Sequence, residues 1–242
     1  MLDFKKETEK RVNYIRRILN EAHASGIIYG NSGGKDSALV GILCKLACDN
    51  TVGITMPCES QRNFGEDMTD GMEVARQFNI ETRNVDLTQA KQFYVSELSA
   101  VTQLKDSAVS NLAPRLRMIT LYAIGASENR LVAGTGNRSE RYMGYFTKWG
   151  DGAFDFNPIA DLLASDIFDY LRYFDAPENI IKKAPSAGLF EGQTDEKEMG
   201  VTYAAIDKYI STGEVTDEDL AVIQRYHKIS HHKRAHQKMY PD

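Results

Sequence analysis

Short apolar runs alternate with longer stretches of helical periodicity as far as Ala133. The runs are bounded by glycine or polar residues and are too short for helices, which is typical of buried strands. Between them, apolar residues recur at i, i+3, i+4 and i+7, as on one face of a helix. The alternation predicts right-handed βαβ units and an α/β fold with a doubly wound parallel sheet flanked by helices. The expected strands are 27–29, 51–56, 81–85 and 131–133.

Beyond Pro158 the pattern changes to short helical segments separated by stretches that contain proline and glycine. Residues 185–200 have little periodicity, and we expect a long loop that acts either as a lid or as a disordered segment, with the lid favoured. The chain is expected to form one domain, 1–242, with helical segments at its C-terminal end. The expected helices are 4–23, one after residue 37, 66–78, 88–101, 114–128, 165–174 and 203–211.

Composition narrows the class of protein. A hydrophobic content of 42% can fill a core, and a net charge of −5 argues against a general nucleic-acid binder. The charged first twenty residues do not resemble a signal peptide, and no apolar run is long enough for a membrane span. The three cysteines, Cys44, Cys48 and Cys58, lack both a disulfide framework and zinc-ligand spacing, so we expect them in the core of a cytoplasmic protein.

The stretch from Gly26 to Ser37, GIIYGNSGGKDS, carries the strongest chemical signal. A glycine-rich turn between a strand and a helix presents free backbone N–H groups at the positive end of the helix dipole, where phosphate binds. The Walker A pattern fails because Asp36 stands where the hydroxyl residue should follow the lysine. The dinucleotide-binding pattern G-x-G-x-x-G fails because the glycines are wrongly spaced. A glycine turn that merely packs a helix against a strand is the structural alternative.

The segment Ser32–Ser37, S-G-G-K-D-S, resembles the PP-loop of ATP pyrophosphatases, which cleave ATP between the α- and β-phosphates. A carboxylate beside a phosphate cradle repels the ligand unless a cation lies between them, and Mg²⁺ binds through one or two carboxylates plus phosphate oxygens. We therefore assign Asp36 to Mg²⁺, and Ser32, Ser37 and the glycine backbone to the pyrophosphate. Lys35 adds positive charge, and the sequence leaves the direction of its side chain open.

A second constellation lies in 134–155, GTGNRSERYMGYFTKWGDGAFD, which reads as a polar, aromatic loop at the carboxyl end of a strand. Together with the PP-loop and the segments 111–125, 184–207 and 230–234, it resembles ammonia-dependent NAD synthetase. The resemblance implies ATP and Mg²⁺ as cofactors, and deamido-NAD and ammonia as substrates. The enzyme would adenylate the nicotinate carboxylate of deamido-NAD, and ammonia would displace AMP to give NAD. It further implies a homodimer with the substrate site at its interface.

The resemblance assigns roles to individual positions. Asp36 and Glu140 would bind Mg²⁺, and these two with Lys148 would form the catalytic set. The ATP site would comprise Gly30, Asn31, Ser32, Gly33, Gly34, Lys35, Asp36, Ser37, Thr135 and Ser186. The deamido-NAD site would comprise Arg115, Lys148, Asp155, His232 and Lys233.

Two positions depart from the family. Gly136 stands where some members have an aspartate, and Ala164 stands where some carry a lysine that contacts ATP. Only 25 residues precede the first expected strand, so we expect no N-terminal glutaminase domain, and ammonia is either free or supplied by a separate glutaminase.

Other functions compete with this one. Another PP-loop amidotransferase or a tRNA-modifying enzyme would share the loop, although a thiolase should add paired cysteines and a basic RNA-binding face. An ATP- or AMP-binding regulatory protein of the same fold is the non-catalytic alternative. His227 and His231 have the i, i+4 spacing of a metal pair, but no further ligand lies near them in the sequence, which favours a basic helix end.

Overall fold

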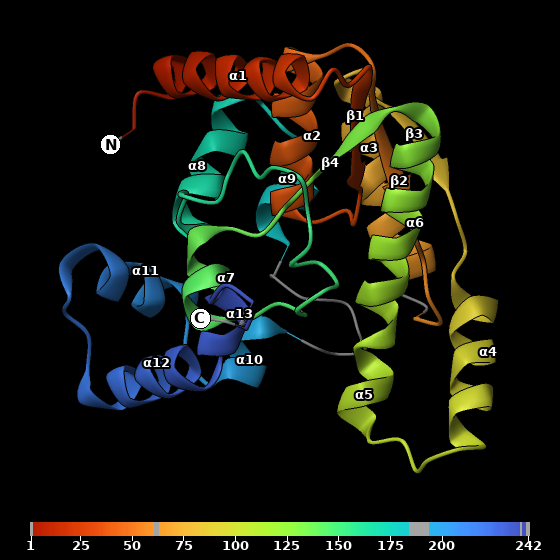
Figure 1. The fold of residues 1–242 in the computed structure, drawn as a ribbon. Coiled ribbons are helices and arrows are strands. Elements are labelled where there is room, and N and C mark those ends of the chain that lie inside the picture. The colour runs from red at the N-terminus through yellow and green to blue at the C-terminus, as the bar shows by residue number, and fades with distance from the viewer. Residues whose placement is uncertain (1, 61–62, 184–193, 238, 241–242) are drawn as a thin grey trace.

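The computed structural model describes residues 2–60, 63–183, 194–237 and 239–240. Its sheet has four parallel strands, as the sequence predicts, and the structure shows their order, β3-β2-β1-β4 (Figure 1). In the centre of the sheet, Ile28 of β1 lies opposite Val52 of β2 and Val132 of β4. The strands are β1 (Gly26–Gly30), β2 (Thr51–Thr55), β3 (Glu81–Asn84) and β4 (Arg130–Ala133).

Side chains of β1 alternate between two hydrophobic layers. Ile27 and Tyr29 belong to the core that the N-terminal helix and its neighbours cover, whereas Ile28 belongs to the opposite core. Both faces of the sheet are therefore covered by helices, as a parallel sheet requires. The first layer contains α1 (Phe4–Glu21), α2 (Lys35–Ala47), α3 (Met68–Gln77), α8 (Ala164–Tyr173) and α9 (Glu178–Lys182); the second contains α4 (Thr88–Ser99) and α6 (Leu112–Glu128).

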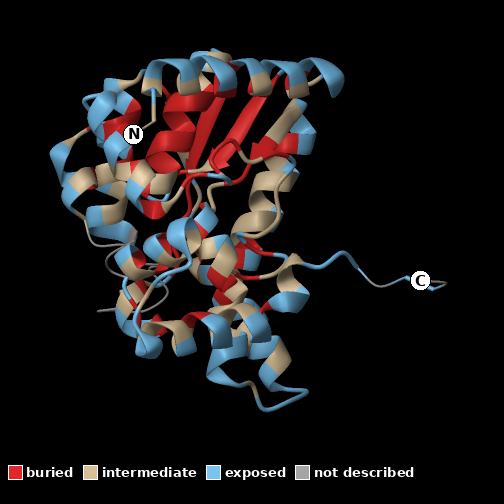
Figure 2. Cartoon of the chain, turned by 90° about the vertical axis from the view of Figure 1, so that its left-hand side faces the viewer, coloured by how far each residue is buried: buried red, intermediate tan, exposed pale blue. Residues whose placement is uncertain are grey.

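A third, smaller core lies below the carboxyl ends of the strands and is formed by the C-terminal helices (Figure 2). Met143, Met199 and Ile223 meet there, each from a different helix. This helical body completes one side of the site described below. Its helices are α7 (Arg138–Met143), α10 (Asp195–Met199), α11 (Tyr203–Thr212) and α12 (Asp217–Ile229), followed by the short α13 (His231–Arg234).

Several helices go beyond the sequence prediction. Two of them, α5 (Asp106–Ser110) and the π-helical turn η1 (Asn63–Asp67), precede predicted helices. The expected lid is helical at α10, while its part 185–193 lies outside the described residues. α12 carries a local signal that periodicity alone misses: Thr216 accepts the N–H of Asp219 at 3.2 Å, and three acidic residues occupy the first turn.

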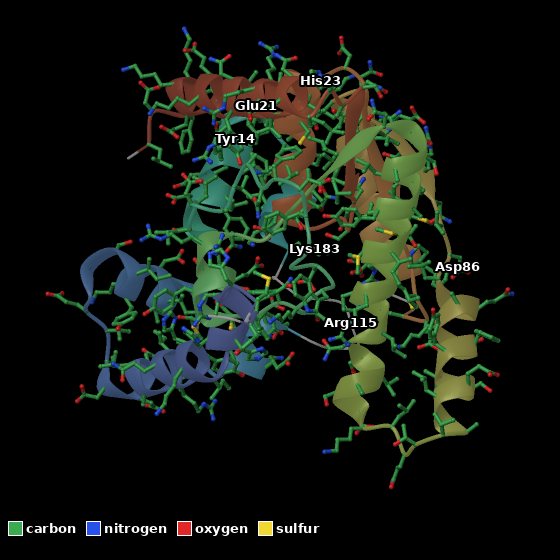
Figure 3. The ribbon with its side chains drawn as sticks, viewed as in Figure 1. Tyr14, Glu21, His23, Asp86, Arg115 and Lys183 are labelled. Atoms are coloured by element: carbon green, nitrogen blue, oxygen red, sulfur yellow. The ribbon has the colours of Figure 1, made fainter. Side chains whose placement is uncertain are left out.

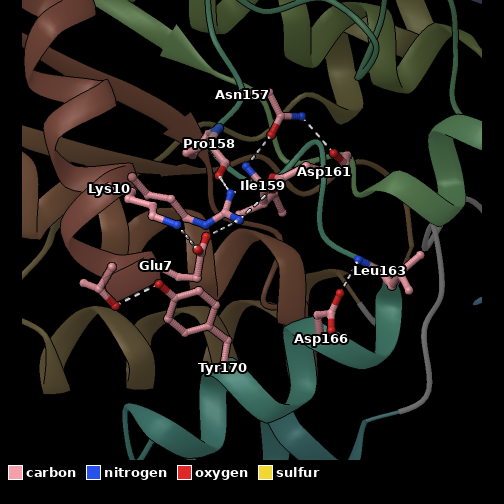
Figure 4. Close-up of polar contacts among 12 residues, drawn as sticks. Glu7, Lys10, Asn157, Pro158, Ile159, Asp161, Leu163, Asp166 and Tyr170 are labelled. Atoms are coloured by element: carbon pink, nitrogen blue, oxygen red, sulfur yellow. Dashed lines mark hydrogen bonds and ion pairs between the residues drawn. The ribbon is translucent and has the colours of Figure 1, made fainter. Parts of the chain in front are cut away.

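The N-terminal helix is fastened to the loop that precedes α8. The guanidinium of Arg11 donates to both carboxylate oxygens of Asp161 at 2.6 and 2.8 Å, and to the carbonyl oxygen of Pro158 at 2.6 Å. Figure 4 shows this loop beside Glu7 and Tyr170. The contact of Arg11 with Pro158 and Asp161 holds the segment that directly follows residues 134–157, which face the site. Within the described part of the chain, no helix is long and apolar enough to cross a membrane.

Candidate active site

A cavity of about 850 Å³ opens at the carboxyl ends of β1, β2 and β4. Ligands of open α/β sheets bind at this edge. The loop after β1 forms one wall, residues 134–136 and α7 form another, and the segment 229–234 closes the far side. The PP-loop, Glu140 and the basic C-terminal segment therefore line one cavity, although they are far apart in the sequence.

Hydrogen bonds of its own side chains hold the loop between β1 and α2 in place. Asn31, only 4% exposed, donates its side-chain amide to the carbonyl oxygen of Gly71 at 3.0 Å. The hydroxyls of Ser32 and Ser37 lie 3.1 Å apart, and Ser37 also donates to the carbonyl oxygen of Gly34 at 3.0 Å. No side chain of the described residues caps α2 at Gly34, so the N–H groups of its first turn are available to an anionic ligand.

The capping box of α7 places Glu140 next to Asp36. Asn137 accepts the N–H of Glu140 at 3.0 Å, and the carboxylate of Glu140 accepts the N–H of Asn137 at 3.0 Å. The side-chain amide of Asn137 then donates to the carboxylate of Asp36 at 2.9 Å. The expected loop 134–155 is therefore wrong in part, because this capping box starts a helix inside it.

Lys35 lies almost entirely inside the protein, with its ammonium on the carboxylate of Asp36. Its Nζ lies 5.7 and 5.6 Å from the ring centroids of Phe168 and Tyr203. Burial lowers the pKa of Lys35, but the charges of Asp36 and Glu140 outweigh burial and raise it. The structure thus settles the direction of this side chain, which the sequence leaves open.

The cavity concentrates negative charge around this lysine. Burial and the neighbouring Asp36 carboxylate hold the pKa of Glu140 well above its usual range. Asp195 of α10, 4% exposed, adds a third carboxylate and accepts a hydrogen bond from the Tyr203 hydroxyl at 3.0 Å. Burial, with the charge of Glu140, likewise raises the pKa of Tyr203. Sequence reasoning missed Asp195 as a member of the site, because only the packing of α10 brings it there.

The expected substrate residues divide into two groups. His232 and Lys233 line the cavity, where Lys233 donates to the carbonyl oxygens of Gly144 and Phe146 at 2.7 and 2.6 Å. Lys148 and Arg115 are outside its lining but adjoin it: Lys148 Nζ donates to the carbonyl oxygen of His232 at 2.8 Å, and Arg115 contacts the carbonyl oxygen of Lys148 at 3.5 Å.

Asp155 also lies outside the cavity lining and is held by the strand and by α6. Its carboxylate accepts the N–H of Val132 at 2.7 Å and the hydroxyl of Tyr122 at 3.2 Å. Burial and the Asp155 charge raise the pKa of Tyr122 to about 12, so this tyrosine stays protonated as a donor. Asp155 therefore ties the end of the segment 134–155 to β4 and α6.

The remaining expected ATP contacts have different outcomes. Thr135 lines the cavity, whereas Ser186 lies outside the described residues. Ala164 is 1% exposed and donates its N–H to the hydroxyl of Ser139 at 3.2 Å, and that hydroxyl in turn donates to Asp207 at 2.5 Å. A buried polar network therefore holds the start of α8, where the resemblance led us to look for a contact with ATP.

A resident metal site is not formed by protein groups alone. Across residues 2–60, 63–183, 194–237 and 239–240, no group of three Asp, Glu, His or Cys side chains could hold a metal ion. His227 and His231 belong to no such group among these residues, and His227 Nδ1 lies 2.9 Å from the carbonyl oxygen of Tyr142. A divalent cation between Asp36 and Glu140 would need ligands from the nucleotide.

The fold and the site define a class: an α/β protein with a PP-loop at the carboxyl edge of a parallel sheet and an acidic partner for that loop on a facing helix. Comparison with known proteins makes the class specific. The family model for NAD synthase matches residues 7–239, and the chain belongs to this family. The chain is therefore a ligase that forms C–N bonds, like the NH₃-dependent NAD⁺ synthetases that it matches.

Similar proteins cover nearly the whole chain. The NH₃-dependent NAD⁺ synthetase of Carboxydothermus hydrogenoformans is 46% identical over 236 residues, which is 96% of each chain. The structure of NMN synthetase from Francisella tularensis superposes with a TM-score of 0.94 at 38% identity and covers 100% of both chains. The NH₃-dependent NAD synthetase of Campylobacter jejuni, solved with a nitrate ion, gives 0.80 at 27% identity over 99% of both chains.

Proposed function

We propose that the cavity binds Mg·ATP with its phosphates on the PP-loop and with Asp36 and Glu140 as the protein ligands of Mg²⁺. The observation that carries the proposal is the approach of these two carboxylates, which Asn137 bridges; burial, together with the Asp36 charge, raises the pKa of Glu140. Two acids held together in a partly buried site favour a divalent cation. When bound, the ion would neutralise charge on the pyrophosphate leaving group.

The residues of the chain then act by positioning and by charge stabilisation. The nicotinate carboxylate attacks the α-phosphorus of ATP, forming an acyl adenylate and releasing pyrophosphate. Ammonia attacks the acyl carbon, the acyl C–O bond breaks, AMP leaves, and one proton is released. Backbone N–H groups at the start of α2 and the cations of the 229–234 segment face the charge that develops on phosphate. No side-chain nucleophile is required.

The acid substrate would extend from the cavity toward the surface that carries Lys148 and Arg115. Lys148 and His232 are joined by a hydrogen bond, so the cavity wall and this outer surface are continuous. Arg115 projects from the N-terminal part of α6 (Figure 3) and is exposed. The proposal includes a homodimer whose interface covers this surface. Light scattering of the purified protein tests the dimer, and a monomer at micromolar concentration would contradict it.

A second candidate differs only in the acid that is amidated. The 0.94 TM-score to the Francisella protein, whose name is NMN synthetase, favours nicotinate mononucleotide as an alternative substrate. This acid carries the same carboxylate and ring as deamido-NAD but lacks the AMP half. The chemistry on ATP is identical for both, so the cavity described above serves either substrate.

The deciding experiment compares both acids at equal concentration with Mg·ATP and ammonium. For an NAD synthetase, kcat/KM is higher for deamido-NAD, and NAD, AMP and pyrophosphate appear in equal amounts. A higher kcat/KM for nicotinate mononucleotide moves the assignment to the second candidate. Release of AMP without either amide refutes both.

A further inference from the structure

A lysine that belongs to none of the expected site positions lies against the PP-loop. Lys183 directly follows α9, and its side chain is 14% exposed (Figure 3). Its ammonium donates to the carbonyl oxygen of Gly33 at 3.4 Å, and to the carboxylates of Asp67 and Asp70 at 2.7 and 2.5 Å. One cation therefore serves a carbonyl of the loop and two acids at once.

The contact falls at the tightest point of the loop. Gly33 has a φ of +70°, and a Cβ there would lie 2.0 Å from the backbone oxygen of Asp67. Because the C=O and N–H of a trans peptide point in opposite directions, holding the Gly33 carbonyl also fixes the direction of the Gly34 N–H. Gly34 lines the cavity and precedes the first turn of α2.

The same ammonium controls the charge beside the loop. The side chains of Asp67 and Asp70 are only 14% and 13% exposed, so water screens them weakly. Asp67 and Lys183 both line the cavity. Asp70 has a second partner, the amide of Asn179 at 2.7 Å, which carries no charge. Without the ammonium, Asp70 would keep only this uncharged partner, and the net negative charge beside the proposed polyphosphate site would increase.

We propose that Lys183 is a positioning residue of the ATP site, which orients the Gly33–Gly34 peptide and offsets part of the negative charge of Asp67 and Asp70 so that the loop can accept the phosphates. This inference rests on the ATP-dependent function proposed above. It assigns Lys183 no contact with the reacting atoms. Its effect is therefore on nucleotide binding, and the acid substrate and ammonium should be bound as before.

The test replaces Lys183 by methionine, which keeps the length of the side chain and removes its charge. The matched control is Lys182→Met, at a neighbouring residue whose side chain is 76% exposed and pairs only with Glu178 at 3.0 Å among the described residues. For Lys183→Met we expect KM for ATP, and the calorimetric Kd for Mg·ATP without acid substrate, to rise at least about tenfold. KM for the acid substrate should change less than about twofold. Lys182→Met should match wild type, and Lys183→Arg should recover much of the loss.

A second variant separates binding from folding. Lys183→Met with Asp70→Asn has the same net charge as wild type in this cluster, so it should fold even where the single variant does not. Its Kd for Mg·ATP should exceed that of wild type by at least about threefold, because at equal net charge the Gly33 carbonyl is no longer held. Equal affinities in these two proteins, or a Lys183→Met variant that binds ATP like Lys182→Met, would overturn the inference. Failure of the wild type to form either amide would refute the proposed function. The calorimetric comparison of ATP affinities would still test the role of Lys183, because it does not depend on product formation.

Discussion

Tyr29→Phe is predicted to stabilise the protein. The Tyr29 ring is 0% exposed, and within the described structure its hydroxyl has no hydrogen-bond partner. The hydroxyl occupies the space that Gly41 and Gly53 leave free: a Cβ at these positions would lie 2.4 and 3.0 Å from the oxygen. Burial, with a smaller contribution from Cys44, raises the pKa of this hydroxyl, so it stays neutral and its desolvation is not relieved by ionisation.

The magnitude follows from two opposing contributions. An unsatisfied buried hydroxyl costs about 1–3 kcal/mol, which phenylalanine removes. The lost oxygen leaves a void of roughly 10 Å³, which at about 24 cal/mol per Å³ costs roughly 0.2 kcal/mol. The variant should therefore gain between about 1 and 2.5 kcal/mol in the free energy of unfolding, or a Tm rise of about 2–4 °C per kcal/mol for a chain of this size.

Tyr170→Phe is the matched control. Tyr170 is equally buried, but its hydroxyl lies 2.8 Å from the hydroxyl of Thr8 and 3.4 Å from the carbonyl oxygen of Phe4. Loss of these contacts should destabilise the protein by about 0.5–1.5 kcal/mol. Urea denaturation with an unchanged m-value measures both variants. If Tyr29→Phe were as destabilised as Tyr170→Phe, the argument from the unsatisfied hydroxyl would be wrong.

Three further predictions concern the site and its support. Asp36→Asn should lower kcat at least about 10³-fold while Tm stays within about 2 °C of wild type, and unchanged turnover would remove the metal assignment. Gly33→Ala should lower the free energy of unfolding by at least about 2 kcal/mol more than Gly213→Ala does. Both glycines have a positive φ, but of the two only Gly33 would bring a Cβ against a backbone oxygen. Equal losses of stability in urea denaturation would refute the clash. Burial raises the pKa of Asp161, but the hydrogen bonds and charge of Arg11 outweigh burial and lower that pKa. The Asp161 carboxylate therefore stabilises the fold above its unfolded pKa of about 3.9, and this contribution is lost as the pH falls through the pKa of the folded state. Asp161→Asn should accordingly destabilise at pH 7 and much less at pH 3, and a loss independent of pH would contradict the pairing with Arg11.

Most of the sheet was predictable because β1, β2 and β4 contain short apolar runs with no competing helical pattern, whereas β3 is polar throughout. Ile27 to Tyr29 and Leu131 to Ala133 are strands as expected, and their carboxyl ends bring the PP-loop and 134–136 to one edge. The spacing of S-G-G-K-D-S identifies the loop from residues 32–37 alone. These features are local or follow from the parallel topology.

The rest of the site depends on tertiary packing that local patterns do not encode. Asp195 lies in the segment 184–207, which contributes to the resemblance but gave this residue no role, and Lys183 lies outside every such segment. They reach the loop only because α10 packs in the C-terminal core and α9 packs against α2 and α8. The capping box Asn137–Glu140 was available as a local signal and would have predicted α7.

Transfer of oxygen from the acid substrate to AMP tests the central claim, that the chain activates a nicotinate carboxylate as its adenylate, most directly. Deamido-NAD labelled with ¹⁸O in the nicotinate carboxylate is converted with Mg·ATP and ammonium, and the products are analysed by mass spectrometry. The account predicts one labelled oxygen in AMP and none in pyrophosphate, since the acyl C–O bond breaks when ammonia attacks. Unlabelled AMP, or label in pyrophosphate, would contradict it.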